Sequence, residues 1–250
     1  MTPEFGSPRT AIVTGGARRI GCQITRALAA DGWMVLIHHH SSGEAAQALA
    51  SELGAQTVQA DLAEPDAADR IVAALDGLPP PALLVNSAAG FDLDGFDDFT
   101  AADWDRHMAV NARAPALLTR AFARALPAGQ AGLVVNLLDA KLAHPNPDFF
   151  TYTVSKMAVA GVTELSARVL AGRGVRVCGI APSVTLVSGP QTRENFERVH
   201  RMNALERGVT VEQIVAALRF IVATPTLTGQ TIMLDGGQRF LGLERDVQFL

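Results

Sequence analysis

This sequence of 250 residues has few cysteines, no strong excess of positive or negative charge, and no long apolar run. Its two cysteines, Cys22 and Cys178, make neither a disulfide framework nor a metal spacing, and both lie in apolar surroundings typical of core residues. A net charge of −4 gives no reason to expect a nucleic-acid partner. No apolar run could span a bilayer, and the N-terminus lacks the basic-then-apolar order of a secretory signal. We therefore expect a cytoplasmic protein without metal, membrane or nucleic-acid partners.

A regular alternation of short apolar runs and helical segments is what the sequence does contain. Strands are expected near residues 10–13, 33–37, 57–60, 82–85, 133–138, 174–180 and 228–234, with helical spacing of apolar residues between them. This alternation predicts an α/β domain with a doubly wound parallel sheet of about seven strands and helices on both faces. No repeat or boundary interrupts it, so we expect one domain over 10–250 after a flexible tail at 1–9.

The turn after the first expected strand is rich in glycine. Residues 14–21 read TGGARRIG and lead into a helical pattern. Glycines let the backbone approach a pyrophosphate, and a helix N-terminus offers free N–H groups and a positive dipole end. The alternative is a tight turn that needs glycine for its shape alone. The flanking strand and helix favour a dinucleotide site.

The second strand ends in three histidines and two serines, at 38–42. Neighbouring side chains on an extended chain point to opposite sides, so these histidines should not converge on a metal. NAD sites usually place a carboxylate here for the ribose 2′-hydroxyl, yet the first one is Glu44. A carboxylate would repel a 2′-phosphate, whereas Arg18, His40, Ser41 and Ser42 could receive it. We therefore favour NADP(H) over NAD.

The stretch from Asp139 to Lys156 indicates acid–base chemistry. Asp139 follows an apolar strand, and Tyr152 and Lys156 lie four residues apart, on one face of an expected helix. An ammonium beside a phenol favours the phenolate, so we expect Lys156 to lower the pKa of Tyr152 from its usual value of about 10. Tyr152 would then be a proton donor near neutral pH. The alternative is an exposed tyrosine and lysine on an ordinary helix.

Three further segments bear on function. A capping box at Thr100 opens a long helix that contains Asn111 and should bend at Pro115. Residues 183–206 are polar, with one short helix expected over 193–202, and suit a loop that covers a substrate. The apolar tail at 239–250 should dock on its own subunit or on a neighbour's.

Together these features resemble the short-chain dehydrogenase/reductase family, from about Thr10 to Gly237. The family pattern has a glycine-rich first turn, an aspartate after the third strand, and asparagines after the fourth strand and in the long helix. A serine, Tyr-x-x-x-Lys and Pro-Gly follow. The residues that match are Asp61, Asn86, Asn111, Tyr152, Lys156 and Pro182.

Three positions depart from that pattern. Arg19 replaces a glycine, Asp139 replaces the catalytic serine, and Ser183 replaces the last glycine. Arg19 and Asp139, with the tyrosine–lysine pair, resemble the pteridine reductase branch, which includes bacterial dihydromonapterin reductases. In that branch Phe91 matches an aromatic residue that stacks a pterin.

The resemblance implies a Rossmann fold, a homotetramer, and NADPH-dependent reduction of a pterin-like C=N bond. Tyr152 would supply the proton, and Asp139 would orient the ring or relay that proton. Lys156 would hold the nicotinamide ribose and tune Tyr152, and Asn111 would keep a water-linked proton path near Lys156. Substrate contacts are implied for Arg19, Phe91, Asp139 and Tyr152. Cofactor contacts are implied for Gly15, Arg18, Arg19, Ile20, Gly21, His40, Ser41, Ser42, Asp61, Leu62, Asn86, Ser87, Ala88, Tyr152, Lys156, Pro182, Ser183 and Thr185.

Two other functions stay open at this point. A general carbonyl or imine reductase of the same family would use Tyr152 and Lys156 on another substrate. A dinucleotide-binding regulator without turnover is a function of another class, and the intact proton-donor pair argues against it.

Overall fold

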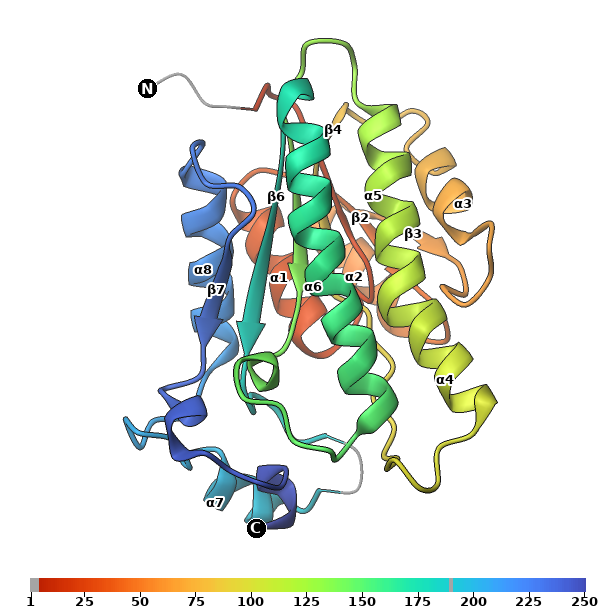
Figure 1. The fold of residues 1–250 in the computed structure, drawn as a ribbon. Helices are drawn as coiled ribbons and strands as arrows, with labels where there is room; N and C mark the ends of the chain where they lie inside the picture. Colours follow the sequence, from red (N-terminus) through yellow and green to blue (C-terminus); the bar gives the residue numbers. More distant parts are fainter. Residues whose placement is uncertain (1–4, 189–190) are drawn as a thin grey trace.

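A seven-stranded parallel sheet forms the centre of the computed structural model, which describes residues 5–188 and 191–250 (Figure 1). The strands are β1 (Thr10–Val13), β2 (Met34–His39), β3 (Gln56–Gln59), β4 (Pro81–Asn86), β5 (Gly132–Leu137), β6 (Val175–Pro182) and β7 (Thr231–Leu234). Their order, β3-β2-β1-β4-β5-β6-β7, confirms the predicted doubly wound Rossmann fold. The direction of winding reverses between β1 and β4, where the ligand crevice of such sheets opens at the carboxyl ends.

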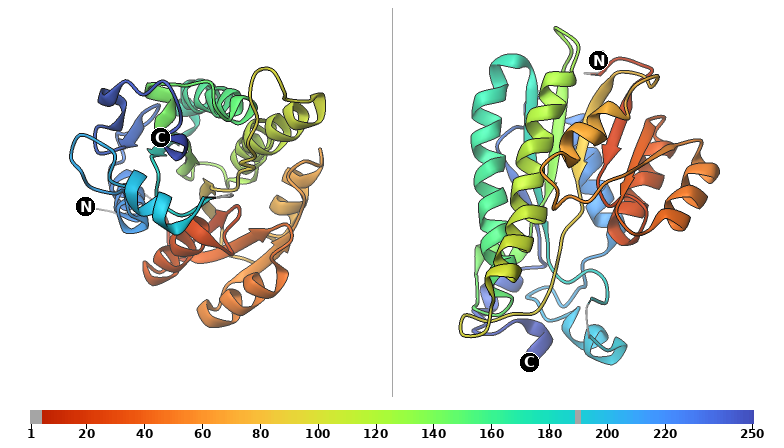
Figure 2. Two further views of the ribbon diagram at one scale, coloured as in Figure 1. Left: turned by 90° about the horizontal axis from the view of Figure 1, so that it is seen from below. Right: turned by 90° about the vertical axis from the view of Figure 1, so that its right-hand side faces the viewer.

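Helices cover both faces of this sheet (Figure 2). One face packs against α1 (Arg19–Ala30), α2 (Gly43–Leu53) and α8 (Val211–Ala223), and the other against α3 (Ala67–Ala73), α5 (Ala114–Ala125) and α6 (Phe150–Leu170). On β5, Leu133 and Val135 face the first core and Val134 faces the second, and all three are fully buried. Because both faces of a central strand are covered, its sequence is apolar throughout.

The long helix predicted after Thr100 consists of three parts. The capping box is confirmed, because the Thr100 side chain accepts from Asp103 N and the Asp103 carboxylate accepts from Thr100 N. A first part, α4 (Ala101–His107), continues through a π-helical turn (Met108–Arg113) into α5. Pro115, where the sequence predicts a bend, lacks an N–H donor, and the wider π turn lies directly before it.

Both ends of the described chain pack on the domain. Residues 1–4 lie outside the described part, whereas residues 5–9, expected in a flexible tail, contact the core. Phe5 is 4% exposed and contacts Trp33, and Arg9 lies over the Trp33 ring. The Phe5 and Trp33 rings are thereby shielded from water, which stabilises the docked stretch. At the other end, the tail docks on its own chain through two 3₁₀ turns, η4 (Gln238–Leu241) and η5 (Val247–Phe249).

The described part of the segment between β6 and α8 is irregular, as expected. Positions 189–190 lie outside the described residues. It contains one helix, α7 (Arg193–Val199), which is shorter than the predicted 193–202. Figure 2 shows α7 and the C-terminal end together, beyond the carboxyl ends of the strands. Within the described part of the chain, every helix is too short or too polar to cross a membrane.

Candidate active site

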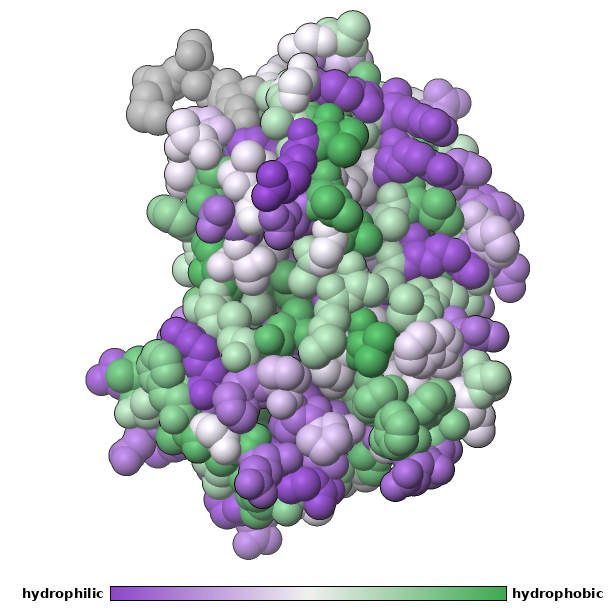
Figure 3. Space-filling view, in the orientation of Figure 1, coloured by the Kyte–Doolittle hydropathy of each residue, from purple (hydrophilic) through white to green (hydrophobic). Residues whose placement is uncertain are grey.

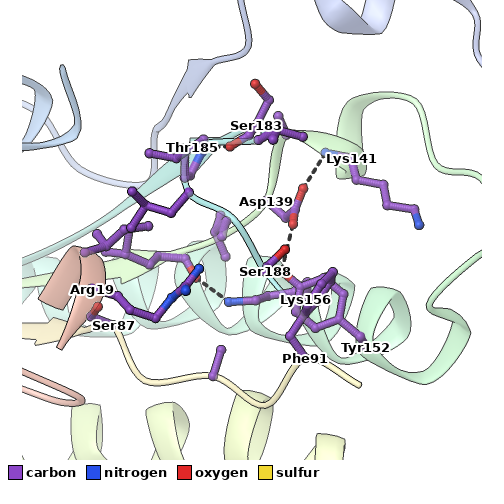
Figure 4. A pocket seen from close by; sticks show the side chains of 18 of the residues that line it. Arg19, Ser87, Phe91, Asp139, Lys141, Tyr152, Lys156, Ser183, Thr185 and Ser188 are labelled. Atoms are coloured by element: carbon purple, nitrogen blue, oxygen red, sulfur yellow. Dashed lines mark hydrogen bonds between the residues drawn. The ribbon is translucent and has the colours of Figure 1, made fainter. Parts of the chain in front are cut away.

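A cavity of about 480 Å³ opens where the strands end (Figure 4). Its walls come from the β1–α1 turn, the ends of β2, β4, β5 and β6, the start of α6, and the C-terminal segment, defined as residues 243–250. Most of the predicted site residues line it: Gly15, Arg18, Arg19, Ile20, Gly21, His40, Ser41, Ser42, Ser87, Ala88, Phe91, Asp139, Tyr152, Lys156, Pro182, Ser183 and Thr185.

Three predicted cofactor residues do not line the cavity. The Asp61 carboxylate lies 3.7 Å from Nε2 of His40, which does line it. The Leu62 side chain is buried in the core under the sheet. Asn86 donates to Asn136 Oδ1 on the neighbouring strand at 2.7 Å. The side chains of Leu62 and Asn86 therefore stabilise the sheet beside the site.

Asn111, the fourth predicted residue outside the cavity wall, ties two elements together. Its Oδ1 accepts from Gly90 N at 2.7 Å, and its Nδ2 donates to Gly90 O and to Ser155 Oγ at 3.0 Å each. It thereby holds the loop after β4 against α6, the helix that carries Tyr152 and Lys156. These bonds engage both polar side-chain atoms of Asn111, and the water-linked proton path near Lys156 stays a prediction.

The β1–α1 turn needs glycine at two positions. Gly15 has a φ of +61°, and a Cβ there would lie 3.1 Å from Ala88 Cα, while a Cβ on Gly21 would lie 2.2 Å from Gly15 O. His38, which the sequence did not single out, holds this turn in place. Its Nδ1 accepts from Gly15 N at 3.2 Å and its Nε2 donates to Ala60 O at 3.0 Å. Burial lowers the pKa of His38 to about 4, so the ring stays neutral and keeps this tautomer.

Arg19 has a backbone conformation that favours glycine. Its φ is +52°, at the position where the family pattern has a glycine, and such a conformation costs about 1 kcal/mol for other residues. Helix α1 begins here with no capping side chain and no acidic residue in its first turn. Its free N–H groups and the two arginines, Arg18 and Arg19, line the cavity with donors that could hold a phosphate.

The end of β2 provides a second place for an anion. Residues 39–42 line the cavity, whereas Glu44 is exposed and does not. The Nδ1 atom of His39 is buried and has no hydrogen-bond partner among the described residues. Such an atom fits a ligand that supplies the partner. His39 was not predicted, because nothing in the sequence distinguishes it from the two histidines beside it.

Asp139 and Tyr152 form a hydrogen bond in the part of the cavity farther from the glycine-rich turn. The phenol donates to Asp139 Oδ2 at 2.7 Å, whereas the Lys156 ammonium donates to Leu137 O at 2.7 Å and lies 5.7 Å from the Tyr152 ring centroid (Figure 4). Burial and then the Asp139 charge raise the pKa of Tyr152 well above its usual value. The prediction that Lys156 lowers this pKa is wrong, because the carboxylate contacts the phenol and the ammonium does not.

Lys156 shares a face of α6 with Tyr152, as predicted, and is 5% exposed. Burial lowers the pKa of this ammonium to about 8, although Asp139 acts in the opposite direction. Lys156 is therefore charged at neutral pH. An ammonium has three N–H donors, so the bond to Leu137 O leaves donors for a ligand.

Phe91 lines the cavity with aromatic support behind it. Its ring meets Tyr152 edge-on, with centroids 4.7 Å apart, and stacks on Phe149 at 4.4 Å with 19° between the planes. Phe149 is buried and has a φ of +53°, immediately before α6. This conformation is costly for a phenylalanine, and here it places the ring that supports Phe91.

Lys141 is a further cavity residue that was not predicted. Lys141 and Lys156 are the only lysines of the chain, and both line the cavity. Burial lowers the pKa of Lys141, and its Nζ lies 3.6 Å from the carboxylate of Asp246 in the C-terminal segment. The scarcity of lysine was the signal in the sequence that could have identified it.

Comparison with known families agrees with this geometry. Residues 15–239 match a family model described as enoyl-(acyl carrier protein) reductase. The chain therefore belongs to the short-chain dehydrogenase/reductase family and is an oxidoreductase of that type.

Within the family the chain is similar to several reductases. The structure of FolM alternative dihydrofolate reductase 1 from Brucella canis, complexed with NADP, matches with a TM-score of 0.90 and 39% identity over 95% of this chain and 96% of that one. The 3-oxoacyl-[acyl-carrier-protein] reductase of Synechocystis sp. is 30% identical over 92% of this chain and 96% of its own. Pteridine reductase 1 of Leishmania tarentolae is 29% identical, over 95% and 98%. The family prediction is confirmed, while the substrates named for these relatives differ.

Proposed function

We propose that the protein binds NADP(H) and reduces a C=N bond of a pterin-like heterocycle. The Asp139–Tyr152 hydrogen bond carries this proposal, together with Phe91 on the wall of the same cavity. A carboxylate can accept N–H bonds from the amidine-like edge of a pterin better than a serine hydroxyl can, and an aromatic ring can stack on the flat heterocycle. The likenesses to the Brucella canis and Leishmania tarentolae proteins support the same function.

The cavity fits a dinucleotide phosphate at three places. The uncapped start of α1, with Arg18 and Arg19, would hold the pyrophosphate. Residues 39–42, with the unpartnered Nδ1 of His39, would hold the 2′-phosphate. Lys156 would donate to the nicotinamide ribose. The reduced cofactor supplies the hydride when bound.

Tyr152 supplies the proton that the reaction requires. When the substrate nitrogen gains negative charge, the Tyr152 O–H bond breaks and an N–H bond forms. The neighbouring Asp139 carboxylate makes a free phenolate costly, so Tyr152 keeps its proton until the substrate takes it.

The first test is NADPH oxidation at neutral pH with a dihydropterin, beside a panel of simple ketones and quinones. Turnover of the dihydropterin alone supports the proposal. Turnover of ketones alone removes the pterin substrate and leaves the fold and the family unchanged.

The Asp139→Ser variant separates the substrate role from the cofactor role. We expect kcat/KM for the dihydropterin to fall by about 10²-fold, because the proton donor loses the group that orients it. The NADPH dissociation constant, measured by titration calorimetry, should stay close to the wild-type value, since Asp139 lies away from the β1–α1 turn. Equal losses in both assays would contradict the assignment of Asp139 to the substrate.

A ketone reductase of the same family is the second candidate. The Synechocystis relative is named for a 3-oxoacyl substrate, and Tyr152 and Lys156 would serve a carbonyl as well as a C=N bond. The ketone arm of the panel decides between the two candidates.

We also infer that the protein assembles as a homotetramer through α6. Leu165 and Val169 on this helix are 64% and 75% exposed, and Figure 3 shows apolar side chains gathered over α6 in the orientation of Figure 1. Exposed apolar area of this kind is a common feature of subunit interfaces. Light scattering should give about four times the chain mass of 26.4 kDa, and the mass of a single chain would contradict the inference. A cytoplasmic location stays a prediction.

A further inference from the structure

The C-terminal segment forms part of the cavity wall that the proposed chemistry does not use. Figures 1 and 2 place the end of the chain beyond the carboxyl ends of the strands, next to α7. A wall at this position meets whatever part of a substrate extends away from the reacting pair. Its lining residues are Leu243, Arg245, Asp246, Val247 and Gln248.

Asp148, in the loop between β5 and α6, holds one end of this segment. Its carboxylate accepts from Arg245 Nε at 2.8 and 3.0 Å and from Asp246 N at 2.7 Å. The Asp148 side chain is 12% exposed. Burial alone would raise the pKa of Asp148, yet Arg245 and the Asp246 N–H outweigh it and the net shift is downward. The carboxylate is therefore charged at neutral pH, and the contact with Arg245 is an ion pair.

Lys141 adds a second contact between the same loop and the same segment. Its ammonium donates to Asp148 O and lies 3.6 Å from the Asp246 carboxylate. Lys141 follows Asp139 by two residues, and its backbone N–H donates to Asp139 Oδ1 at 2.8 Å. The segment is therefore connected to the loop that also orients the proton-donor pair.

The other end of the segment is attached to α7. Asn195 Nδ2 donates to Gln248 O at 3.2 Å, and Arg198 donates to Leu250 O. The segment thus spans the cavity from the β5–α6 loop to α7. Because contacts on both sides hold it, it cannot move outward without breaking one of the two sets.

An aromatic stack joins the segment to the ring proposed to stack the substrate. Phe249 packs on Phe149 with centroids 5.9 Å apart and 21° between the planes, and Phe149 stacks on Phe91. The position of Phe91 therefore depends partly on the docked segment.

The segment also limits the direction in which a substrate can extend. It lines the cavity, and contacts with the β5–α6 loop and with α7 hold it in place. A substituent on the substrate ring that points toward this wall would meet the segment, so a long one would require the segment to move.

We propose that the C-terminal segment is a specificity-determining wall of the substrate site, positioned by the Asp148–Arg245 ion pair, and that it limits the substrate to a flat heterocycle with a short substituent. The part of this inference that concerns substrates rests on the proposed function, whereas the positioning by Asp148 and Arg245 does not. Arg245 is a positioning residue, because it acts through the placement of the segment.

Three variants test the positioning. Arg245→Gln removes the ion pair, Arg245→Lys keeps the charge, and Arg219→Gln is the matched control. The control removes a similar two-point ion pair, Arg219 to Asp31 at 2.8 and 2.9 Å, between α8 and α1. We expect faster backbone hydrogen exchange at residues 140–149 and 193–199 in Arg245→Gln, with partial recovery in Arg245→Lys and no change there in the control. Unchanged exchange at both stretches in Arg245→Gln would overturn the positioning role.

A comparison of two substrates with the same ring tests the size limit. One is a dihydropterin with a short substituent, and the other is dihydrofolate, which carries a long arm. We expect the wild-type protein to favour the short one, and the ratio of the two kcat/KM values to fall at least about fivefold in Arg245→Gln, largely through KM. NADPH binding should stay unchanged in all variants. Faster exchange with an unchanged ratio would overturn the specificity role.

Failure of the proposed function would be distinguishable from failure of this inference. If neither pterin is reduced, the pterin proposal fails. The exchange experiment still decides the positioning role, and the ratio is then measured with short and long members of whichever carbonyl class is reduced. If Arg245→Gln leaves this ratio of kcat/KM values unchanged, the specificity role of the C-terminal segment is overturned in that case also.

Discussion

The two halves of the cavity are built in different ways. The half that we propose for the cofactor, called the cofactor half, takes the residues proposed to hold the phosphates from one continuous stretch, 15–42, which runs from the β1–α1 turn to the end of β2. The substrate half combines Phe91, Asp139, Tyr152 and the C-terminal segment from distant parts of the chain. Backbone geometry within a short motif therefore determines the first half, whereas the packing of loops on one another determines the second.

This difference predicts where changes should act. In the cofactor half, glycines and a helix start create the site, so substitutions there should alter cofactor affinity. In the substrate half, side-chain contacts create the site, so substitutions there should alter turnover and leave cofactor affinity unchanged. Lys156 lies between the halves and should affect both.

The largest effect should come from Tyr152→Phe, which removes only the hydroxyl. We expect kcat to fall by about 10²–10⁴-fold, because the proton donor is lost, while NADPH affinity stays close to that of the wild type. Stopped-flow measurement of NADPH oxidation with calorimetry of NADPH binding checks both. A variant as active as the wild type would revive the reading of the protein as a dinucleotide-binding regulator.

The state of this donor can also be measured directly. Tyr152 is the only tyrosine of the chain, so phenolate absorbance in the ultraviolet reports its ionisation alone. The raised pKa predicts no phenolate in the cofactor-free, folded protein up to a pH of about 10, the usual tyrosine value. In Asp139→Ser the phenolate should appear at lower pH. A phenolate that forms near neutral pH in the wild type would contradict the arrangement of Asp139 and Tyr152.

Deprotonation of Lys156 at high pH should produce a smaller effect. It should lower activity and raise the free energy of unfolding. Its pKa is lowered to about 8, so kcat/KM for NADPH should fall above this pH by up to about tenfold per unit, as the ammonium loses its proton. Between about 8 and the free-lysine value of 10.5 the unfolded chain binds more protons than the folded one. The contribution of Lys156 to the free energy of unfolding should therefore rise with pH across this window.

Lys156→Arg provides the control for this pH dependence. A guanidinium stays charged across the same range, so the decline of kcat/KM near pH 8 should disappear, whatever activity remains. Denaturant unfolding of both proteins at several pH values measures the stability part. A decline that persists unchanged in Lys156→Arg would show that another group causes it.

The smallest effect should come from Arg19→Gly in the cofactor half. Glycine removes the cost of the φ of +52° at this position, so the free energy of unfolding should rise by about 0.5–1 kcal/mol and Tm by about 2 °C. NADPH affinity should fall by about tenfold, because a charged donor is lost. Arg18→Gly is the matched control, since Arg18 has a φ of −141° and glycine there should not stabilise the fold. Equal changes in Tm for both variants would contradict the strain at Arg19.

Local patterns predicted most of the secondary structure and the glycine-rich turn whose residues line the cavity. The capping box at Thr100 opens a helix as expected, and the sheet has the predicted seven strands. Predictions that depended on partners across the fold were less successful. The sequence shows Tyr152 and Lys156 on one helix face, yet the nearest charge to the phenol is Asp139, which arrives from β5. Lys141 lies beside Asp246 of the C-terminal segment, a contact between residues far apart in the chain.

The sequence by itself determined the alternation of strands and helices, the glycine-rich turn after β1 and the presence of ionisable side chains near the ends of strands, because spacing along the chain and glycine conformations are local properties. Only the tertiary structure decided which charge controls Tyr152, where Asn111 and Leu62 lie, and what closes the substrate half. Those outcomes depend on burial and on distances of a few ångströms between segments far apart in the chain. Coulombic and desolvation energies change steeply over such distances, so no pattern along the chain could specify them.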